Sequence, residues 1–291
     1  MGNTLKRLWA LFGVALLLLG IREHFEPYLL LRLDNVLGLS PTPVELPLEN
    51  GLSLMAYPDA QPHIGKIDEL QKGLVLAADG AILIEEGFGF GVPIVRYGDT
   101  TFQARRANLA RLNEDGRSSL LKEYDIAVAD RPTRPLTRKY LDTRSRGTVL
   151  ITYTLAGAHE ISITVDLTHL EEGWDEVFVM NEQGARGFTR YQDETGTVWD
   201  EAPGIWEARV DRCGCWIHPG AQVRFCVETV DPRARYIGRE RYYQYYWAGI
   251  YALSWSGIDL HLTPPERVVT YSVHVERLPE DEGAWDHVPC S

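Results

Sequence analysis

The sequence is short of positive charge, and of lysine in particular. Its 291 residues include 29 Lys and Arg against 41 Asp and Glu, which gives a formal net charge of −12 and a pI near 5.2. Only five of the basic residues are lysines. An acidic surface repels phosphate backbones, so no nucleic-acid partner is expected. The hydrophobic fraction of 45% is too high for a disordered chain and predicts a folded protein with a large core.

Familiar catalytic and cofactor-binding motifs are also missing. The chain has no G-x-S-x-G elbow, no H-E-x-x-H helix, no Walker loop and no EF-hand loop, so we expect no cofactor and no bound metal. The glycines of residues 87–91 are spaced G-x-G-x-G, which is not a dinucleotide fingerprint. They favour a β-bulge or a close backbone approach. The alternative is a ligand-facing loop with Phe88 and Phe90 as platforms.

The longest hydrophobic run lies at the N-terminus and is short for a membrane span. Lys6 and Arg7 precede 14 uncharged residues, 8–21, whereas a spanning helix needs about 20. No small-x-small cleavage site follows. We therefore expect an uncleaved signal anchor in the cell membrane, with residues 1–7 cytoplasmic and the body extracytoplasmic. The alternatives are a cleaved signal, which makes the protein secreted, and a buried helix of a cytosolic protein.

Residues 22–43 are expected to join the anchor to the body as a juxtamembrane helix and a Pro-rich linker. One stripe of the helix is apolar, at Leu29, Leu30, Leu33, Val36 and Leu37. This stripe would lie on the membrane surface or dock against the body domain.

From residue 44 onward the chain has the pattern of β-strands joined by short turns. Asp79-Gly80 between two apolar runs is the strongest hairpin signal. Strand–helix alternation and internal repeats are absent, and only residues 104–112 have a helix-like composition. Residues 44–291 are thus predicted to be all-β, a large antiparallel β-sandwich, either single or double (a super-sandwich). The strand count is similar to that of the large sandwiches of carbohydrate-active proteins, although no motif is shared.

Three of the four cysteines lie close together, and Cys290 is next to last. Residues 215–226 have the pattern of a hairpin that turns near Pro219-Gly220. A loop at 220–221 places Cys215 opposite Cys226, whereas a loop at 219–220 places Cys213 there. A disulfide among Cys213, Cys215 and Cys226 is expected, which agrees with export. Free thiols are the alternative, and a zinc site is disfavoured because paired C-x-x-C spacing is missing.

Residues 242–255 form an aromatic run that predicts a ligand site. As one extended segment bending near residues 248–249, the run places five aromatic residues on one face: Tyr243, Tyr245, Trp247, Tyr251 and Trp255. Aromatic faces stack on sugar rings, and Arg239 and Arg241 just before them supply hydrogen-bond donors. The alternative is that one face is core and the other an ordinary sheet surface.

Carboxylate and histidine side chains offer a second, catalytic interpretation. Glycoside hydrolysis needs two carboxyl groups that face each other, and they must come from different strands because neighbours in a strand point to opposite faces. Glu86 and Asp99 flank the glycine loop and are the candidates, with solvated surface charge as the simpler account. Asp166 with His169, and also His261, are candidates for a metal or proton-transfer site.

The sequence therefore predicts a membrane-anchored, extracytoplasmic β-sandwich that binds a polysaccharide or another envelope component without catalysis. A second hypothesis is a carbohydrate-active enzyme, a hydrolase, lyase or epimerase, that uses paired carboxylates. A third is an envelope structural or assembly protein whose partner is another protein.

Overall fold

The computed structural model describes residue 13 and residues 43–56, 73–83, 89–114, 117–130, 140–142, 144–200, 207–229, 236–246, 251–281 and 285. These residues form nineteen strands and one short 3₁₀ turn, so the all-β prediction is confirmed. Among them, no helix has the length and apolar character needed to cross a membrane. The predicted anchor, apart from Gly13, and the predicted juxtamembrane helix lie outside the described residues and stay predictions.

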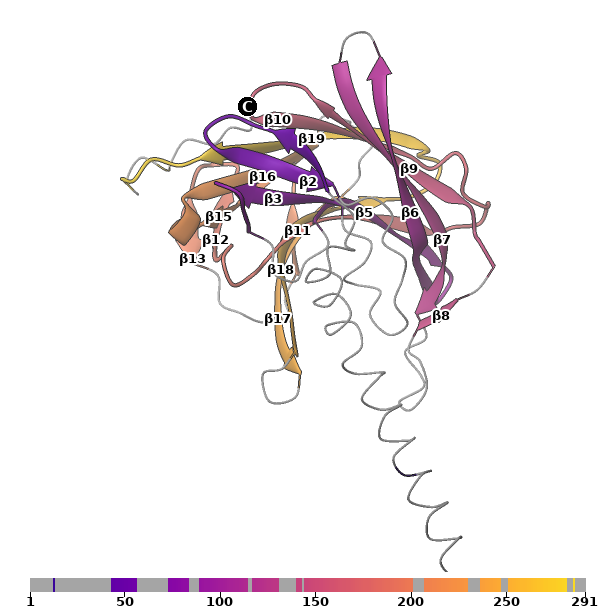
Figure 1. Ribbon diagram of the computed structural model, residues 1–291. Helices are drawn as coiled ribbons and strands as arrows, with labels where there is room; N and C mark the ends of the chain where they lie inside the picture. The colour runs from indigo at the N-terminus through magenta and orange to yellow at the C-terminus, as the bar shows by residue number, and fades with distance from the viewer. Residues whose placement is uncertain are drawn as a thin grey trace, which may run out of the picture.

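The strands form one large antiparallel sheet that folds back on itself into two layers (Figure 1). The first layer contains, in spatial order, β7 (Arg117–Asp130), β9 (Thr148–Leu155), β10 (Glu160–Asp166), β19 (Val268–Arg277), β16 (Val223–Thr229), β15 (Cys213–His218), β12 (Arg190–Asp193) and β13 (Val198–Asp200). The second contains β1 (Val44–Pro47), β2 (Leu52–Ala56), β3 (Leu74–Ala78), β5 (Gly89–Tyr97), β11 (Glu176–Gln183), β18 (Tyr251–Leu262), β17 (Tyr236–Tyr246) and β14 (Glu207–Val210).

A long strand connects the two layers at one side. β6 (Thr100–Glu114) pairs with β5 through its first residues and with β7 along its length. The short strands β4 (Ala81–Ile82) and β8 (Tyr140–Asp142) are added to β3 and β7. The helix-like composition of residues 104–112 was therefore misleading, since these residues lie in β6. A partner strand paired with residues 106–112 outweighs a weak local helix propensity.

The core lies between the two layers and is built by alternation along the strands. In β10 the residues Ile161, Ile163 and Val165 are fully buried, while those between them are half-buried. Val177 and Val179 of β11 belong to the same apolar cluster. The β-branched side chains and the period of two explain why these segments are strands with one face in the core.

Two predicted turns are confirmed. Asp79 and Gly80 have φ values of +50° and +79° at the β3–β4 turn, the left-handed conformation that two-residue hairpins require. The cysteine hairpin turns at Pro219–Ala221, and its register pairs Cys215 with Cys226. These two cysteines form a disulfide with a Cα–Cα distance of 4.0 Å, and Cys213 is disulfide-bonded as well. Free thiols and a zinc site are thus wrong for these three residues.

Lys122 of β7 faces the core, and its burial predicts an unusual pH dependence. Lys122 is 2% exposed, and burial lowers its pKa to about 7 from 10.5. Between these values the unfolded chain binds one proton more than the folded protein, so stability rises with pH across this interval. Lys122→Met is expected to raise the melting temperature most at pH 6, with a gain that shrinks toward pH 10. Leu121→Met is the control, because the Leu121 side chain points to the other face, and its melting temperature should show no such trend in parallel thermal scans. An equal gain in melting temperature for Lys122→Met at pH 6 and at pH 10 would contradict the prediction.

Candidate functional site

The candidate site lies on the face of β5, β11 and β18 that points away from the core, which we call the outer face. These three strands are neighbours in the second layer. Alternate residues such as Val177, Val179 and Leu260 are buried in the core. The residues between them belong to the outer face: Val92, Ile94, Arg96, Glu176, Phe178, Met180, Glu182, Asp259 and His261. Val92, Ile94, Phe178 and Met180 form a separate apolar cluster on this face.

The carboxylate of Glu176 joins two of these ionisable side chains. Its Oε2 accepts a hydrogen bond from Nη2 of Arg96 at 2.7 Å, and its Oε1 lies 3.1 Å from Nδ1 of His261. The three residues come from three adjacent strands. Only 18% of the Glu176 side chain and 15% of the His261 side chain are exposed, which screens the pair from water better than a surface ion pair.

This contact favours one tautomer of the His261 ring. An ionised carboxylate only accepts hydrogen bonds, so beside an ionised Glu176 the donor is the Nδ1–H of His261. In the neutral ring Nε2 is then the basic nitrogen. The ring also packs edge-on against Phe178, with 4.6 Å between the ring centroids. A histidine held by a carboxylate and an aromatic ring is suited to general acid–base chemistry.

Two further carboxylates lie on the outer face, on the same pair of strands. Glu182 is fully buried and Asp259 is 6% exposed. Asp259 accepts a hydrogen bond from the backbone N–H of Asn181 at 3.0 Å. Gly257 lies opposite Glu182, and a Cβ at this glycine would come within 2.5 Å of Cγ of Glu182. The Glu182 side chain therefore fits here because residue 257 has no side chain.

Asn181 organises the backbone beneath these carboxylates from the core side. Its Oδ1 accepts from the Tyr271 hydroxyl at 2.7 Å and from Gly91 N–H at 3.1 Å, and its Nδ2 donates to Val179 and Ile258 carbonyls. The register between β5 and β11 shifts at this point, at a β-bulge. Burial raises the pKa of Tyr271 well above its usual value, so its hydroxyl stays a neutral donor. One fully bonded amide thus links β5, β11, β18 and β19.

The described part of the glycine loop, residues 89–91, contributes the bulge. Gly89 and Gly91 have positive φ values, and a Cβ at Gly91 would come within 2.7 Å of the Tyr153 hydroxyl. The predicted bulge and close approach are therefore confirmed. Phe90 is fully buried in the core, so its role as a platform was wrong. Phe88 lies outside the described residues.

The carboxylates proposed from sequence are not brought together among the described residues. Asp99 is exposed in the turn between β5 and β6, and Glu86 lies outside the described part of the chain. Asp166 accepts hydrogen bonds from the N–H and hydroxyl of Thr168, and His169 is exposed. Within the part of the chain that the structure describes, no group of three His, Cys, Asp or Glu side chains is arranged to hold a metal ion.

The aromatic run forms a hairpin and not one bent strand. β17 pairs with β18 so that Tyr242 lies opposite Trp255 and Tyr246 opposite Tyr251. Positions 251 and 255 therefore share a face with 242 and 246, whereas 243 and 245 belong to the other face. The expectation of one common face was wrong, because β18 pairs antiparallel with β17 and does not continue it as one strand. Trp247 lies outside the described residues, and the ligand role of the aromatic residues stays a prediction.

The two arginines before this run have partners inside the molecule. Arg241 is 5% exposed and donates from Nη2 to the Ala185 carbonyl at 2.9 Å. The Arg239 guanidinium stacks over the ring of Tyr191 at 4.0 Å and over that of Trp199 at 5.0 Å. These contacts fasten the base of the hairpin to the body.

Sequence reasoning named His261 but missed its partner and the two buried carboxylates. The spacing of Glu176, Phe178, Met180 and Glu182 by two residues does place them on one strand face. His261 lies 85 residues after Glu176 in the sequence. Nothing in the sequence indicates that its strand, β18, lies beside the strand of Glu176. The pairing of distant strands is a property of the fold.

No protein-family model matches the chain, and no curated protein matches its sequence. Among solved structures it is similar to a putative aldose 1-epimerase from Escherichia coli K12, with a TM-score of 0.43 and 11% identity over 81% of this chain and 100% of that one. It is also similar to a heparan sulfate lyase HepC mutant from Pedobacter heparinus, with a TM-score of 0.44 and 8% identity over 80% of this chain and 36% of that one.

A third similar structure is the α-N-acetylgalactosaminidase NagBb from Bifidobacterium bifidum, with a TM-score of 0.47 and 9% identity over 80% of this chain and 36% of that one. This chain thus spans about a third of the length of the lyase and of the galactosaminidase. These neighbours are carbohydrate-active enzymes. Since every TM-score is below 0.5, the likeness carries no conclusion about what this chain does, and its function is argued from its own residues.

Proposed function

We propose that the protein is a carbohydrate-active enzyme that transfers protons at the Glu176–His261 pair. The observation that carries this proposal is the Glu176 carboxylate, which bridges Arg96 and His261 across three strands of the outer face. A neutral imidazole whose Nδ1–H is held by a carboxylate acts as a base through Nε2 and returns the proton as an acid.

The surroundings of the pair favour a sugar as the molecule acted on. Phe178 packs against His261 and belongs to the apolar cluster of the outer face, and aromatic rings stack on the apolar faces of sugar rings. Carboxyl groups serve as acid or base in glycoside chemistry, and the Glu176 carboxylate on this face is partly exposed, at 18% of its side chain. Epimerase, lyase and hydrolase reactions all begin with such a proton transfer.

We further propose that this chemistry takes place outside the cytoplasm. The Cys215–Cys226 disulfide and the disulfide of Cys213 support this location, because disulfides persist in oxidising compartments. The basic-flanked hydrophobic run at residues 8–21 supports a signal anchor that holds the acidic body at the outer side of the cell membrane.

Non-catalytic glycan binding at the β17–β18 hairpin is the second candidate function. Figure 1 shows this hairpin projecting away from the two layers, and its strands contain most of the aromatic run. A projecting hairpin rich in Tyr and Trp is suited to contact an extended polysaccharide.

One experiment separates the two candidates. The purified protein is incubated with a panel of neutral and acidic oligosaccharides, and NMR follows both conversion and ligand line broadening. Conversion that is lost in His261→Asn but kept in His274→Asn supports the enzyme. His274 is the matched control, because its Nε2 also faces a glutamate, Glu228, at 3.8 Å, but on the first layer. Binding without conversion that is lost in Trp255→Ala supports the hairpin and overturns the catalytic proposal.

A further inference from the structure

The outer face of β18 continues without interruption from the candidate site into the projecting hairpin. β18 pairs with β17 from Tyr251 to His261 in one continuous register, and its inner part pairs with β11. Side chains alternate between the two faces of a strand, so the odd-numbered positions from 251 to 261 share the face of His261. We call these positions the β18 line; in order they are Tyr251, Leu253, Trp255, Gly257, Asp259 and His261.

The two ends of the β18 line differ in chemistry. Residues 242–258 contain no charged side chain, whereas Asp259 and His261 end the line with ionisable groups. The uncharged end is aromatic, and positions 242 and 246 of β17 lie opposite Trp255 and Tyr251 and so belong to the same face. Uncharged Tyr and Trp rings pack against the apolar faces of sugars. A sugar chain laid along the line therefore meets aromatic positions at one end and the candidate site at the other.

The part of β18 between these two ends is held in place by the body. The indole N–H of Trp216 donates to the Gly257 carbonyl at 2.9 Å, and Gly257 is also the register partner of Glu182 on β11. Trp255 and His261 are six residues apart, which is about 20 Å along a strand. The distance between the aromatic end and the candidate site is therefore fixed, and a single sugar ring is too small to span it.

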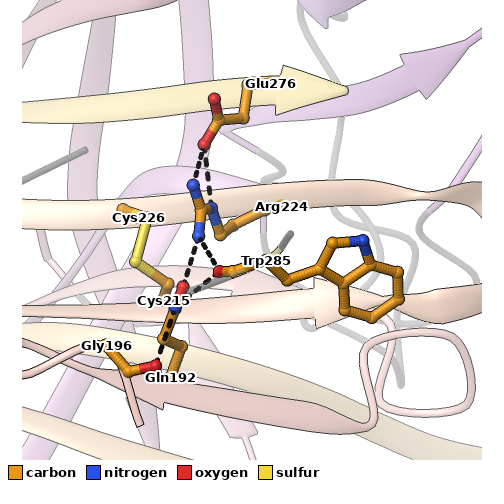
Figure 2. Close-up of polar contacts among 7 residues, drawn as sticks. All are labelled: Gln192, Gly196, Cys215, Arg224, Cys226, Glu276 and Trp285. Atoms are coloured by element: carbon orange, nitrogen blue, oxygen red, sulfur yellow. Dashed lines mark hydrogen bonds and ion pairs between the residues drawn. A yellow bond between two sulfur atoms is a disulfide. The ribbon is translucent and has the colours of Figure 1, made fainter. Parts of the chain in front are cut away.

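Trp255 differs from Trp285, a tryptophan that the fold itself holds. Trp285 is 3% exposed, and its main-chain carbonyl accepts from Nη1 of Arg224 at 3.0 Å and from Nε2 of Gln192 at 2.8 Å (Figure 2). Arg224 in turn donates from Nε to Oε1 of Glu276 at 2.8 Å, which ties Trp285 into a buried polar network of the first layer. Trp255 is only half-buried and lies on the outer face of the second layer. Its side chain is therefore partly accessible to a ligand.

We propose that the β18 line binds one extended glycan chain, with the reacting sugar at His261 and further sugar units at Trp255 and toward Tyr251. The substrate class is thus an oligosaccharide or polysaccharide and not a single sugar. This inference rests on the proposed function, because it takes the Glu176–His261 pair as the reacting end. It joins the two candidate functions, since binding at the hairpin then serves conversion at the pair. In this arrangement Trp255 determines specificity for chain length.

The test measures kcat/KM of the full-length protein for linear oligosaccharides of glucose, N-acetylglucosamine and uronate, from the disaccharide to the octasaccharide. In the series that is converted, the octasaccharide should have a kcat/KM at least about ten-fold above that of the disaccharide, because only the longer chain reaches Trp255 and binding far from the reacting sugar raises the rate. Trp255→Ala should reduce kcat/KM about ten-fold more for the octasaccharide than for the disaccharide, since one stacking contact is lost.

Trp285→Phe is the control for the replacement of a tryptophan. It keeps the main-chain carbonyl that Arg224 and Gln192 bind, and it lies on the first layer. It should lower the melting temperature without changing the ratio of the two kcat/KM values. Trp255→Phe keeps an aromatic ring and should keep the dependence on chain length. Conversion of the disaccharide reports whether each variant is folded.

Equal kcat/KM values for the disaccharide and the octasaccharide in the wild-type protein would overturn the inference and leave the proposed function in place. If no oligosaccharide is converted, the proposed function fails, and equilibrium binding of the octasaccharide then tests the β18 line by itself. Weaker binding in both Trp255→Ala and His261→Asn supports one continuous site. Weaker binding in Trp255→Ala alone, or no binding at all, overturns it. Binding to phosphatidylcholine vesicles in place of oligosaccharides, lost in Trp255→Ala, also overturns it and makes the hairpin a membrane contact.

Discussion

Replacing Glu176 by Gln is expected to lower kcat by about 10²–10⁴-fold on whichever oligosaccharide the protein converts. The amide is nearly the same size as the carboxylate, so the packing of β11 is kept. The amide presents an N–H₂ as well as a carbonyl, so it no longer holds His261 in the Nδ1-protonated tautomer. Because the amide is uncharged, it also does not stabilise the imidazolium that forms when His261 accepts a proton. The measurement is steady-state kinetics, in which kcat should fall far more than KM changes.

Glu228→Gln is the matched control for this variant. Glu228 is also a mostly buried glutamate that faces a histidine, His274, but it lies on the first layer away from the outer face. It should keep nearly wild-type turnover. Arg96→Lys is a second control, since it keeps a positive charge near the 2.7 Å contact with Glu176 and should lose less activity than the Gln variant. Full turnover in Glu176→Gln would remove this pair from the mechanism.

Arg224→Ala is expected to lower the free energy of unfolding by about 3–5 kcal/mol, the range for breaking a buried ion pair from one side. The guanidinium is 2% exposed and bonds Glu276, Gln192 and the Trp285 carbonyl at the same time. Its removal leaves a cavity and deprives three acceptors of a donor. Urea unfolding of the protein without reducing agent measures the change.

The control for Arg224 is an arginine in an exposed ion pair. Arg209 faces Asp211 at 3.4 Å, with 64% and 79% of the two side chains exposed, so Arg209→Ala should cost less than about 1 kcal/mol. Similar losses in both variants would mean that the network around Trp285 adds little to stability. A double replacement, Arg224→Met with Glu276→Leu, should cost less than Arg224→Ala because no carboxylate is left without its partner.

Local patterns in the sequence predicted individual strands and turns well. The alternation of Ile161, Ile163 and Val165 is visible in the sequence, and it becomes the core face of β10. The Asp79-Gly80 turn and the cysteine hairpin were also predictable, because a turn of few residues and a period of two are encoded within a dozen positions. Even here the sequence left two registers open for the cysteine hairpin. The position of the two-residue loop differs by one residue between these registers.

Two of the incorrect expectations have one physical cause. Residues 104–112 have helical composition, but β7 supplies a partner over the whole length of β6. The aromatic run was expected to be one bent segment, but the pairing of Tyr242 with Trp255 makes it a hairpin and changes which residues share a face. In both cases the decisive interaction is a hydrogen-bonded partner, which composition does not contain.

The acidic charge, the scarcity of lysine and the alternating strands of this protein follow from its sequence alone, because composition and period are local properties. Its candidate site does not, since Glu176 and His261 are 85 residues apart and become neighbours only through the register of β11 with β18. The same holds for Arg224 and the carbonyl of Trp285, which are separated by 61 residues. The tertiary structure decided these contacts because strand order and register are chosen by burial of the whole core, to which every strand contributes at once.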